Sequence, residues 1–214
     1  MYNLPYFKEN EQGPVIEFMQ QHPFVVITEV DKDNNPVATH VPLLFDFRGE
    51  KLFLRGHIMR QTDHHKAFVQ NPNVLAVFNG PQIYVSASWY SDKLQGSTWN
   101  YMTVHAKGTM RFLEEEKLVN LLRDLTAHFE NDENSPSLYD NLPDAYIQRM
   151  IKAIVAFEIE VTDIDNVFKL SQNRDKKSYE TIIEKLSGLG SDGKAIADEM
   201  EKRSLQLFKH EMIE

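Results

Sequence analysis

The sequence predicts a mainly β fold with peripheral helices (α+β), in which short strands form a closed or partly open barrel. Runs of β-branched and aromatic residues follow one another at close spacing, and turn residues separate them. Helical patterns lie between only a few of these runs, whereas a parallel doubly wound sheet needs a helix between most strands. Apolar residues make up 42% of the 214 positions, which is enough for a real core.

The chain begins with a predicted helix and a meander of strands. Val15, Phe18 and Met19 recur at helical spacing, and Pro23 ends a helix that we expect over residues 11–21. The hydrophobic runs that follow predict strands over residues 24–30, 37–45 and 51–56, with turns at 33–36 and 48–50.

The middle of the chain continues with a short helix and three further strands. Asn71-Pro72 ends a helix predicted over residues 61–70. Strands are expected over residues 74–78, 82–86 and 100–113, around the turn at 79–81 and a loop at 91–98. Alternation in the longest strand places its apolar and small side chains on one face: Met102, Val104, Ala106, Gly108 and Met110.

The last part of the chain is mainly helical. A leucine stripe from Leu118 to Leu125 predicts a helix, and its acidic first turn suits the positive end of the helix dipole. A helix over residues 144–152, a strand over 155–161, and two charged helices over 175–187 and 194–209 are expected to follow. We therefore expect a barrel domain with an N-terminal helix over residues 1–170 and a C-terminal helical extension over residues 171–214.

The composition excludes several kinds of protein. The net charge of −9 disfavours general binding to nucleic acid, and the best basic cluster, Arg174 with Lys176 and Lys177, is small. The chain has no cysteine, which excludes disulfides and thiolate zinc sites. Residues 1–11 do not resemble a secretory signal, and no segment approaches the roughly 20 apolar residues of a membrane span. We expect a cytoplasmic protein with no membrane partner.

Residues 55–62 carry the clearest chemical signal. Arg55 and Arg60 offer fixed cations, His57 and Thr62 offer further hydrogen-bond donors, and Gly56 allows a ligand to approach the backbone. A helix is expected to begin directly after them, and a helix N-terminus attracts anions. The segment therefore has the parts of a phosphate site, although a strand end with solvated charges has the same composition.

Other motifs are less specific. Residues 188–193 match G-x-G-x-x-G, but a helix rather than a strand precedes them, so we interpret them as a linker between helices. Pro42 lies inside a predicted strand, which indicates a sheet edge or a place where a ligand meets the backbone. Trp89-Tyr90 and Trp99-Asn100 bracket a polar loop and could stack on a flat ring or simply pack. Five histidines (40, 57, 64, 65 and 105) raise the question of a metal or haem, but no metal-binding spacing accompanies them, and we predict no metal site.

Taken together, six segments resemble the PaiB-type regulators, a branch of the FMN-binding split-barrel superfamily that includes pyridoxamine-phosphate oxidases. The segments are Met1-Tyr2 with Pro5 and Phe7; residues 38–44; residues 54–57 with Arg60; residues 84–90; residues 98–101 with Val104, His105 and Gly108; and residues 169–174. The strings Thr98-Trp99-Asn100-Tyr101 and Lys169-Leu170-Ser171-Gln172-Asn173-Arg174 are the most specific of these.

The resemblance implies a split β-barrel homodimer with FMN at the subunit interface. It implies that the flavin phosphate is held by Arg55, Gly56, His57, Arg60, Gln61 and Thr62. It also implies that Thr39, His40, Val41 and Pro42 lie against the isoalloxazine, that Trp99 and Asn100 reach it from the partner chain, and that the segment with Ser171 and Gln172 closes the site. One position departs from the pattern: many relatives have Asn-Pro where this chain has Thr62-Asp63, and a carboxylate beside a phosphate is unfavourable.

Two functions are consistent with these observations. The first is an FMN-binding regulator of the PaiB type that does not bind DNA directly in a sequence-specific way, because the chain is acidic and has no helix-turn-helix signature. The alternative is an FMN-dependent oxidoreductase that acts on a small substrate, although no residue stands out as a catalytic acid or base. Haem binding is a third and weaker alternative, because related split barrels bind haem.

Overall fold

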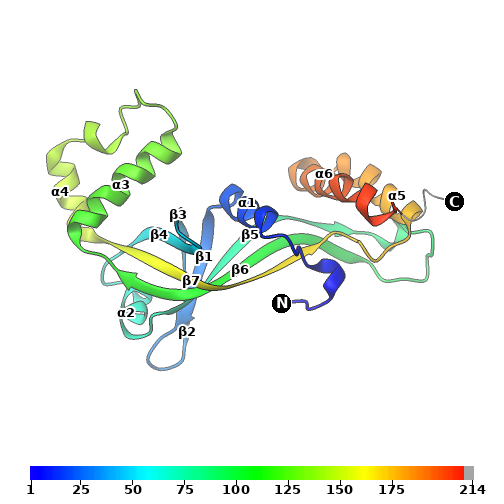
Figure 1. Ribbon diagram of the computed structural model, residues 1–214, viewed down its shortest axis with the longest axis horizontal. Helices are drawn as coiled ribbons and strands as arrows, with labels where there is room; N and C mark the ends of the chain where they lie inside the picture. The colour runs from blue at the N-terminus through cyan, green and yellow to red at the C-terminus, as the bar shows by residue number, and fades with distance from the viewer. Residues whose placement is uncertain (210–214) are drawn as a thin grey trace. The chain divides into compact units, whose positions relative to one another are not determined.

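The computed structural model describes residues 1–209, and within them seven strands form one sheet in the order β2-β1-β5-β6-β7-β4-β3 (Figure 1). The strands are β1 (Phe24–Val30), β2 (Pro36–Pro42), β3 (Leu44–Arg48), β4 (Lys51–Met59), β5 (Asn73–Val85), β6 (Thr98–Phe112) and β7 (Ile154–Lys169). The helices are α1 (Gln12–Gln21), α2 (Asp63–Gln70), α3 (Glu115–Glu130), α4 (Asp144–Ala153), α5 (Lys176–Ser187) and α6 (Gly190–Leu207). Three short 3-10 turns complete the chain: η1 (Pro5–Phe7), η2 (Ala87–Trp89) and η3 (Tyr139–Asn141).

The described chain divides into two compact units. Unit 1 comprises residues 1–19, 79–104 and 165–209, and unit 2 comprises residues 20–78 and 105–164. The strands β5, β6 and β7 each contribute one part to each unit. The predicted division at residue 170 follows the composition of the sequence and stays a prediction.

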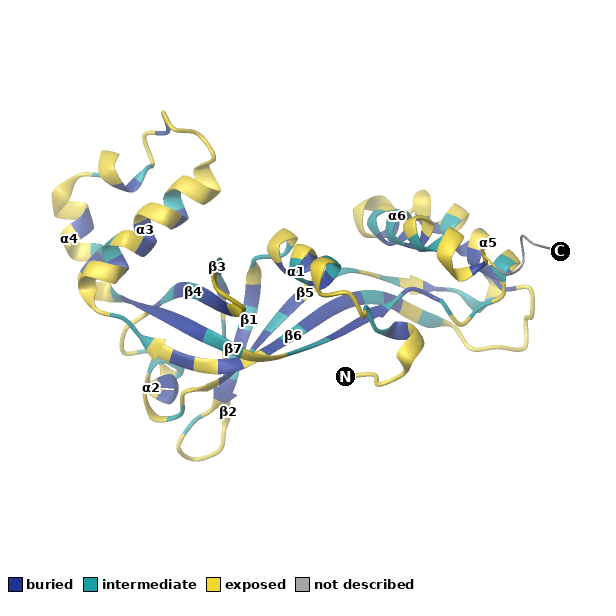
Figure 2. Ribbon diagram, viewed as in Figure 1, coloured by how far each residue is buried: buried dark blue, intermediate teal, exposed yellow. Residues whose placement is uncertain are grey.

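In unit 2, antiparallel pairing sets the strand register. β1 pairs with β2, so that Ile27 lies opposite Thr39, and β4 pairs with β7, so that Gly56 lies opposite Phe157. The leucine stripe of α3 buries its apolar face against α4, β3 and β7, as the amphipathic pattern predicts. Figure 2 shows this alternation of buried and exposed residues along the helix. The core formed in this way contains Leu44, Leu118, Leu121, Leu122, Leu125, Tyr139, Ile147, Ile151 and Ala156.

In unit 1, α5 and α6 lie side by side (Figure 1). The fully buried Tyr179 of α5 donates its hydroxyl to the carbonyl of Met200 on α6 at 2.9 Å. A Cβ atom on Gly193 would lie 2.6 Å from the carbonyl oxygen of Leu186, so only glycine allows the two helices to come this close. The N-terminal segment joins the same unit, because the rings of Phe18 and Phe168 lie 5.1 Å apart.

The prediction of a single strand over residues 37–45 is wrong. β2 ends at Pro42, and β3 begins at Leu44. Proline has no N–H for the ladder, and the N–H of Leu43 donates to Pro23 at 2.9 Å rather than to the next strand. The chain therefore changes partner here, from β1 for β2 to β4 for β3.

Several other boundaries also differ from the sequence prediction. The strands predicted over 74–78 and 82–86 form the single strand β5, because the backbone stays extended through residues 79–81. β7 continues to Lys169, well beyond the predicted end at 161. The helix predicted from residue 61 begins at Asp63, because Gln61 has a left-handed φ of 67° and Thr62 is the N-cap. The linker predicted over 188–193 is shorter than expected, since α5 ends at Ser187 and α6 already begins at Gly190.

Candidate functional site

The residues that the sequence predicts for the site divide between the two units. Unit 2 holds Thr39, His40, Val41, Pro42, Arg55, Gly56, His57, Arg60, Gln61 and Thr62, and unit 1 holds Trp99, Asn100, Ser171 and Gln172.

The strand β4 presents Arg55 and His57 on the same face, because side chains two positions apart point to the same side of a strand. Nδ1 of His57 is buried and has no hydrogen-bond partner among the described residues. Burial lowers the pKa of the His57 imidazole, so the ring is neutral at physiological pH. A neutral, unpartnered ring nitrogen is available to bond a ligand.

Gly56 between them has a packing role that the sequence did not show. A Cβ atom at this position would lie 2.8 Å from Cζ of Phe157 and 3.2 Å from the carbonyl oxygen of Pro42. The glycine therefore lets β4 approach β7 and the end of β2, which brings Pro42 next to the Arg55–His57 segment.

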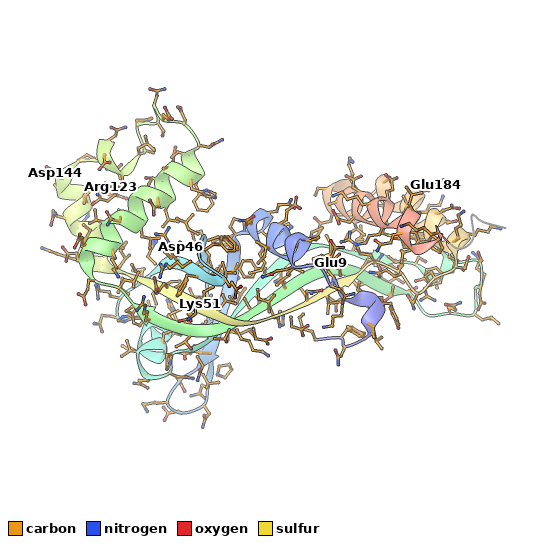
Figure 3. The ribbon with its side chains drawn as sticks, viewed as in Figure 1. Glu9, Asp46, Lys51, Arg123, Asp144 and Glu184 are labelled. Carbon is orange, nitrogen blue, oxygen red and sulfur yellow. The ribbon has the colours of Figure 1, made fainter. Side chains whose placement is uncertain are left out.

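Two carboxylates accompany Arg55. Nη1 of Arg55 donates to Oδ2 of Asp124 on α3 at 2.9 Å. Nε lies 3.8 Å from Oδ2 of Asp46 and makes no hydrogen bond to any residue from 1 to 209. Asp46, labelled in Figure 3, lies on β3 and also accepts from Arg48 at 2.6 Å. The positive charge of Arg55 is therefore partly balanced before any ligand arrives.

A buried ion network lies on the neighbouring strands. The Glu158 side chain on β7 is 3% exposed and accepts from Arg48 at 3.0 Å and from Nε of Arg111 at 2.6 Å. Burial would raise the pKa of Glu158, but the hydrogen bonds from both arginines outweigh it and hold the pKa below its usual value. Sequence reasoning missed this network. A glutamate between Phe157 and Ile159 in a buried strand was the available signal, but its partners come from strands distant in sequence.

The turn between β4 and α2 fixes Arg60 and Thr62. The backbone N–H of Arg60 donates to Ala153 at 2.8 Å, and its Nε donates to the carbonyl of Ile154 at 2.9 Å. The Thr62 side chain caps α2 by accepting from the N–H of His65. The guanidinium of Arg60 is exposed beyond its one bond and can reach an anion.

Asp63 occupies the start of α2. Its carboxylate accepts from the N–H of His64 at 2.8 Å and lies 3.1 Å from the ring nitrogen Nδ1 of the same residue. The backbone N–H of His64, with further help from its ring, lowers the pKa of the Asp63 carboxyl. The anion position at this helix N-terminus is therefore taken by the protein's own carboxylate in this structure.

The segment Thr39–Pro42 lies on β2, which is the last strand at one end of the sheet order. This position confirms the sheet edge that Pro42 indicates. Val41 is buried, whereas His40 is exposed, and the ring of His40 stacks on Phe24 with centroids 6.0 Å apart.

In unit 1, the structure brings Asn100 and Ser171 together. Asn100 is fully buried, and its Oδ1 accepts from the Ser171 hydroxyl at 2.9 Å. Gln172 instead bonds its own segment, accepting from Leu170 at 2.8 Å and donating to Phe168 at 2.5 Å. Trp99 is 54% exposed, and its ring lies edge-on to that of Tyr84 with centroids 6.1 Å apart.

The donors of unit 2 fit the phosphate of FMN. Arg55, His57 and Arg60 follow one another along one segment, and Arg55 and His57 each carry a buried nitrogen that has no hydrogen-bond partner in the described part of the chain. An oxyanion is the natural complement of such a donor set. No group of three His, Asp or Glu side chains in residues 1–209 is arranged to hold a metal ion. None of the helices in the same residues has the length and apolar character of a membrane span.

Comparisons with known proteins agree with this fit. The family model described as "Putative FMN-binding domain" matches residues 1–163. The protease synthase and sporulation protein PAI 2 of Bacillus subtilis is 35% identical over 206 residues, which cover 95% of this chain and 98% of that protein. Among solved structures, the FAD and heme binding protein from Mycobacterium smegmatis has a TM-score of 0.55 at 14% identity, over 76% of this chain and 73% of that one. The flavocytochrome Anf3 from Azotobacter vinelandii has a TM-score of 0.54 at 12% identity, over 78% of this chain and 72% of that one.

The fold and the site define an FMN-binding split-barrel protein, and FMN is its cofactor. The chain belongs to the PaiB-type branch of that family. The comparisons thus confirm the predicted fold class, the family and the cofactor.

Proposed function

We propose that this protein is a flavin-binding regulator that acts without direct, sequence-specific binding to DNA. The relative from Bacillus subtilis bears a name that connects it with protease synthesis and sporulation, which supports a regulatory role. The charge distribution supports the second half of the proposal. Two arginines near the flavin segment are paired with carboxylates, Arg48 with Glu158 and Arg55 with Asp124, which leaves less free positive charge there for a nucleic acid.

A gel-shift assay tests the DNA part of the proposal. The purified protein, with and without FMN, is expected to give no sequence-specific shift of a promoter fragment at moderate salt. A tight complex that weakens steeply with added salt would show phosphate contacts and would contradict the proposal. The absence of cysteine is consistent with a cytoplasmic protein, a location that cell fractionation would test.

We assign the flavin phosphate to the Arg55–Thr62 segment of unit 2. When bound, FMN supplies redox chemistry through its ring system. Arg55→Gln and His57→Gln are expected to weaken FMN binding about tenfold or more, because each removes a donor to a charged group. Arg123→Gln is the matched control, since Arg123 also carries an exposed pair with an aspartate, Asp140, but lies on α3 outside the segment. Quenching of flavin fluorescence measures the affinities.

The predicted homodimer is part of the proposal. Several large apolar side chains are exposed in the single chain, among them Phe24, Met59 and Val69 in unit 2 and Tyr84 and Trp99 in unit 1. The rings of Tyr84 and Trp99 lie 6.1 Å apart, and contiguous exposed apolar surface commonly marks an interface. Light scattering after size exclusion is expected to give twice the chain mass, and a monomer at micromolar concentration would contradict it.

The second candidate function is an FMN-dependent oxidoreductase. His57 favours it, because a neutral imidazole with an unpartnered nitrogen can bond either the flavin or a small substrate. Anaerobic mixing with NADH or NADPH would bleach the visible absorbance of bound flavin. If neither donor reduces the flavin, this candidate loses its support.

A further inference from the structure

Tyr90 and Arg174 of unit 1 form a stacked pair in which both residues carry a buried, unsatisfied polar atom. Cζ of Arg174 lies 4.1 Å from the centroid of the Tyr90 ring. Tyr90 is 1% exposed, and neither its hydroxyl nor Nε of Arg174 has a hydrogen-bond partner within residues 1–209. Buried polar groups are nearly always hydrogen-bonded in folded proteins, so two unpartnered polar atoms in one stacked pair require a physical explanation.

Lys169 is a second cation on the same stretch of chain, five positions before Arg174. Its Nζ donates to the hydroxyl of Thr98 and to the carbonyl of Trp99 at 3.0 Å, and it lies 5.7 Å from the Tyr2 ring. These contacts are neutral or aromatic. Neither Lys169 nor Arg174 forms an ion pair with a carboxylate in the described part of the chain.

The nearest acidic residue along the chain is engaged elsewhere. Asp175 is the N-cap of α5, where its carboxylate accepts from the N–H of Ser178 at 2.9 Å and from the Ser91 hydroxyl at 3.2 Å. Burial, and then the charge of Arg174, lower the pKa of the Lys169 ammonium. The stretch with Lys169 and Arg174 therefore carries excess positive charge, although the net charge of the chain is −9.

The chemistry of the three side chains defines the missing partner. A phenol, a guanidinium and an ammonium can each donate a hydrogen bond, and two of them are cations. Carboxylates and phosphates complement such a set, because they accept several hydrogen bonds and carry negative charge. Arg174 is partly exposed, so a ligand can reach its guanidinium from solvent.

We propose that Tyr90, Arg174 and Lys169 form a binding site for a small oxyanion, the carboxylate or phosphate group of a molecule other than FMN. That the ligand is a second molecule rests on the proposed function, which assigns the single phosphate of FMN to the Arg55–Thr62 segment of unit 2. Arg174 and Lys169 bind the anion, and the Tyr90 ring holds the guanidinium in place while its hydroxyl donates to the same ligand.

Tryptophan fluorescence gives a direct readout of this site. The chain has two tryptophans: Trp89 is the neighbour of Tyr90, and the carbonyl of Trp99 binds Lys169. The purified protein is titrated with inorganic phosphate and, separately, with succinate, at constant ionic strength. A saturable change is expected for at least one of them, and the comparison separates a phosphate site from a carboxylate site.

Three variants assign the response. Arg174→Gln is expected to weaken binding about tenfold or more, because a charge-assisted hydrogen bond is lost. Tyr90→Phe keeps the ring and is expected to weaken binding about threefold to tenfold. Lys177→Gln removes one exposed charge nearby and is expected to change nothing. Thermal unfolding confirms that each variant is folded. If Arg174→Gln does not fold, the affinity of Tyr90→Phe for the oxyanion tests the proposal.

Flavin titration of the same proteins separates this proposal from the proposed function. FMN affinity is expected to be unchanged in Arg174→Gln. If FMN and phosphate are lost together, the cations hold the flavin phosphate and the second-ligand proposal is overturned. If neither oxyanion gives a saturable response, it is also overturned, whereas a protein that binds the oxyanion but not FMN contradicts only the flavin assignment.

Discussion

Arg55 on β4 and Asp124 on α3 form an ion pair, with Nη1 of Arg55 2.9 Å from Oδ2 of Asp124. The Asp124 side chain is 49% exposed, so solvent screens the pair and it contributes little to stability. The Arg55–Asp124 pair has a larger effect on the binding of FMN. The arginine assigned to the phosphate is shared with a carboxylate of the protein, and FMN must compete with that carboxylate.

Asp124→Asn is therefore expected to strengthen FMN binding about twofold to fivefold, because it frees Nη1 of Arg55 and removes a negative charge near the phosphate. Fluorescence titration of the apoprotein measures the effect, and it is expected to shrink at high salt. A weaker affinity in the variant would mean that Asp124 orients Arg55 for the phosphate instead of competing with it.

A second carboxylate affects the same site from α2. Because Asp63 occupies the anion position at the N-terminus of this helix, Asp63→Asn is expected to strengthen FMN binding about twofold to fivefold. Asp192→Asn is the matched control, since Asp192 lies in the first turn of α6 in unit 1. Equal effects of the two substitutions would show that net charge alone is responsible.

The alternation of side chains made most of the sheet predictable. β1 agrees with the sequence prediction residue for residue, and in β6 the face from Met102 to Met110 is buried as expected. The errors occur where a local signal competed with pairing to a distant strand. Pro42 alone could not show that the chain changes its partner strand at Leu43. Residues 79–81 have the composition of a turn, but they lie inside β5.

The candidate site was predictable only as a set of donors. The sequence pointed to Arg55, His57 and Arg60, but it could not show that Asp124 and Asp46 face Arg55. Those carboxylates come from other elements, and only the folded chain brings them near. The expectation that Gly56 admits a ligand stays a prediction, and the structure adds a packing role against Phe157 that the sequence did not show.

Glu29 makes the stability of the protein depend on pH. Its side chain lies on β1, is 9% exposed, and has no hydrogen-bond partner for either oxygen among the described residues. Burial, and then the nearby charge of Asp31, raise its pKa to about 7. Because the folded state holds the proton more tightly than the unfolded chain, this stabilisation is complete below the unfolded pKa and is lost as the pH rises through about 7.

Glu29→Gln removes this dependence. Between about pH 5 and pH 8, the free energy of unfolding of the wild type is expected to fall by about 2 to 3 kcal/mol relative to that of the variant. Urea unfolding of both proteins at the two pH values measures the difference, and groups that titrate equally in both cancel. Parallel pH profiles would show that the Glu29 carboxyl finds a partner and keeps an ordinary pKa.

Gly108 lies where β6 passes β7 inside unit 2. A Cβ atom at this position would press on the carbonyl oxygen of Glu160 and on the side chain of Ile159, which is fully buried. The backbone of β7 cannot move aside without disturbing its pairing with β4, in which Glu160 lies opposite Phe53. Gly108→Ala is therefore expected to lower the free energy of unfolding by about 1 to 3 kcal/mol.

Gly13→Ala is the control for that substitution. Gly13 lies in α1, and no described residue comes within 4 Å of an added Cβ, so alanine is expected to stabilise the protein by up to about 1 kcal/mol through helix propensity. The same substitution to alanine is thus expected to lower the free energy of unfolding at Gly108 and to raise it at Gly13. If Gly108→Ala were also neutral or stabilising in urea unfolding, β6 and β7 would have room to separate at this point, and the close crossing of the two strands would not be what selects glycine there.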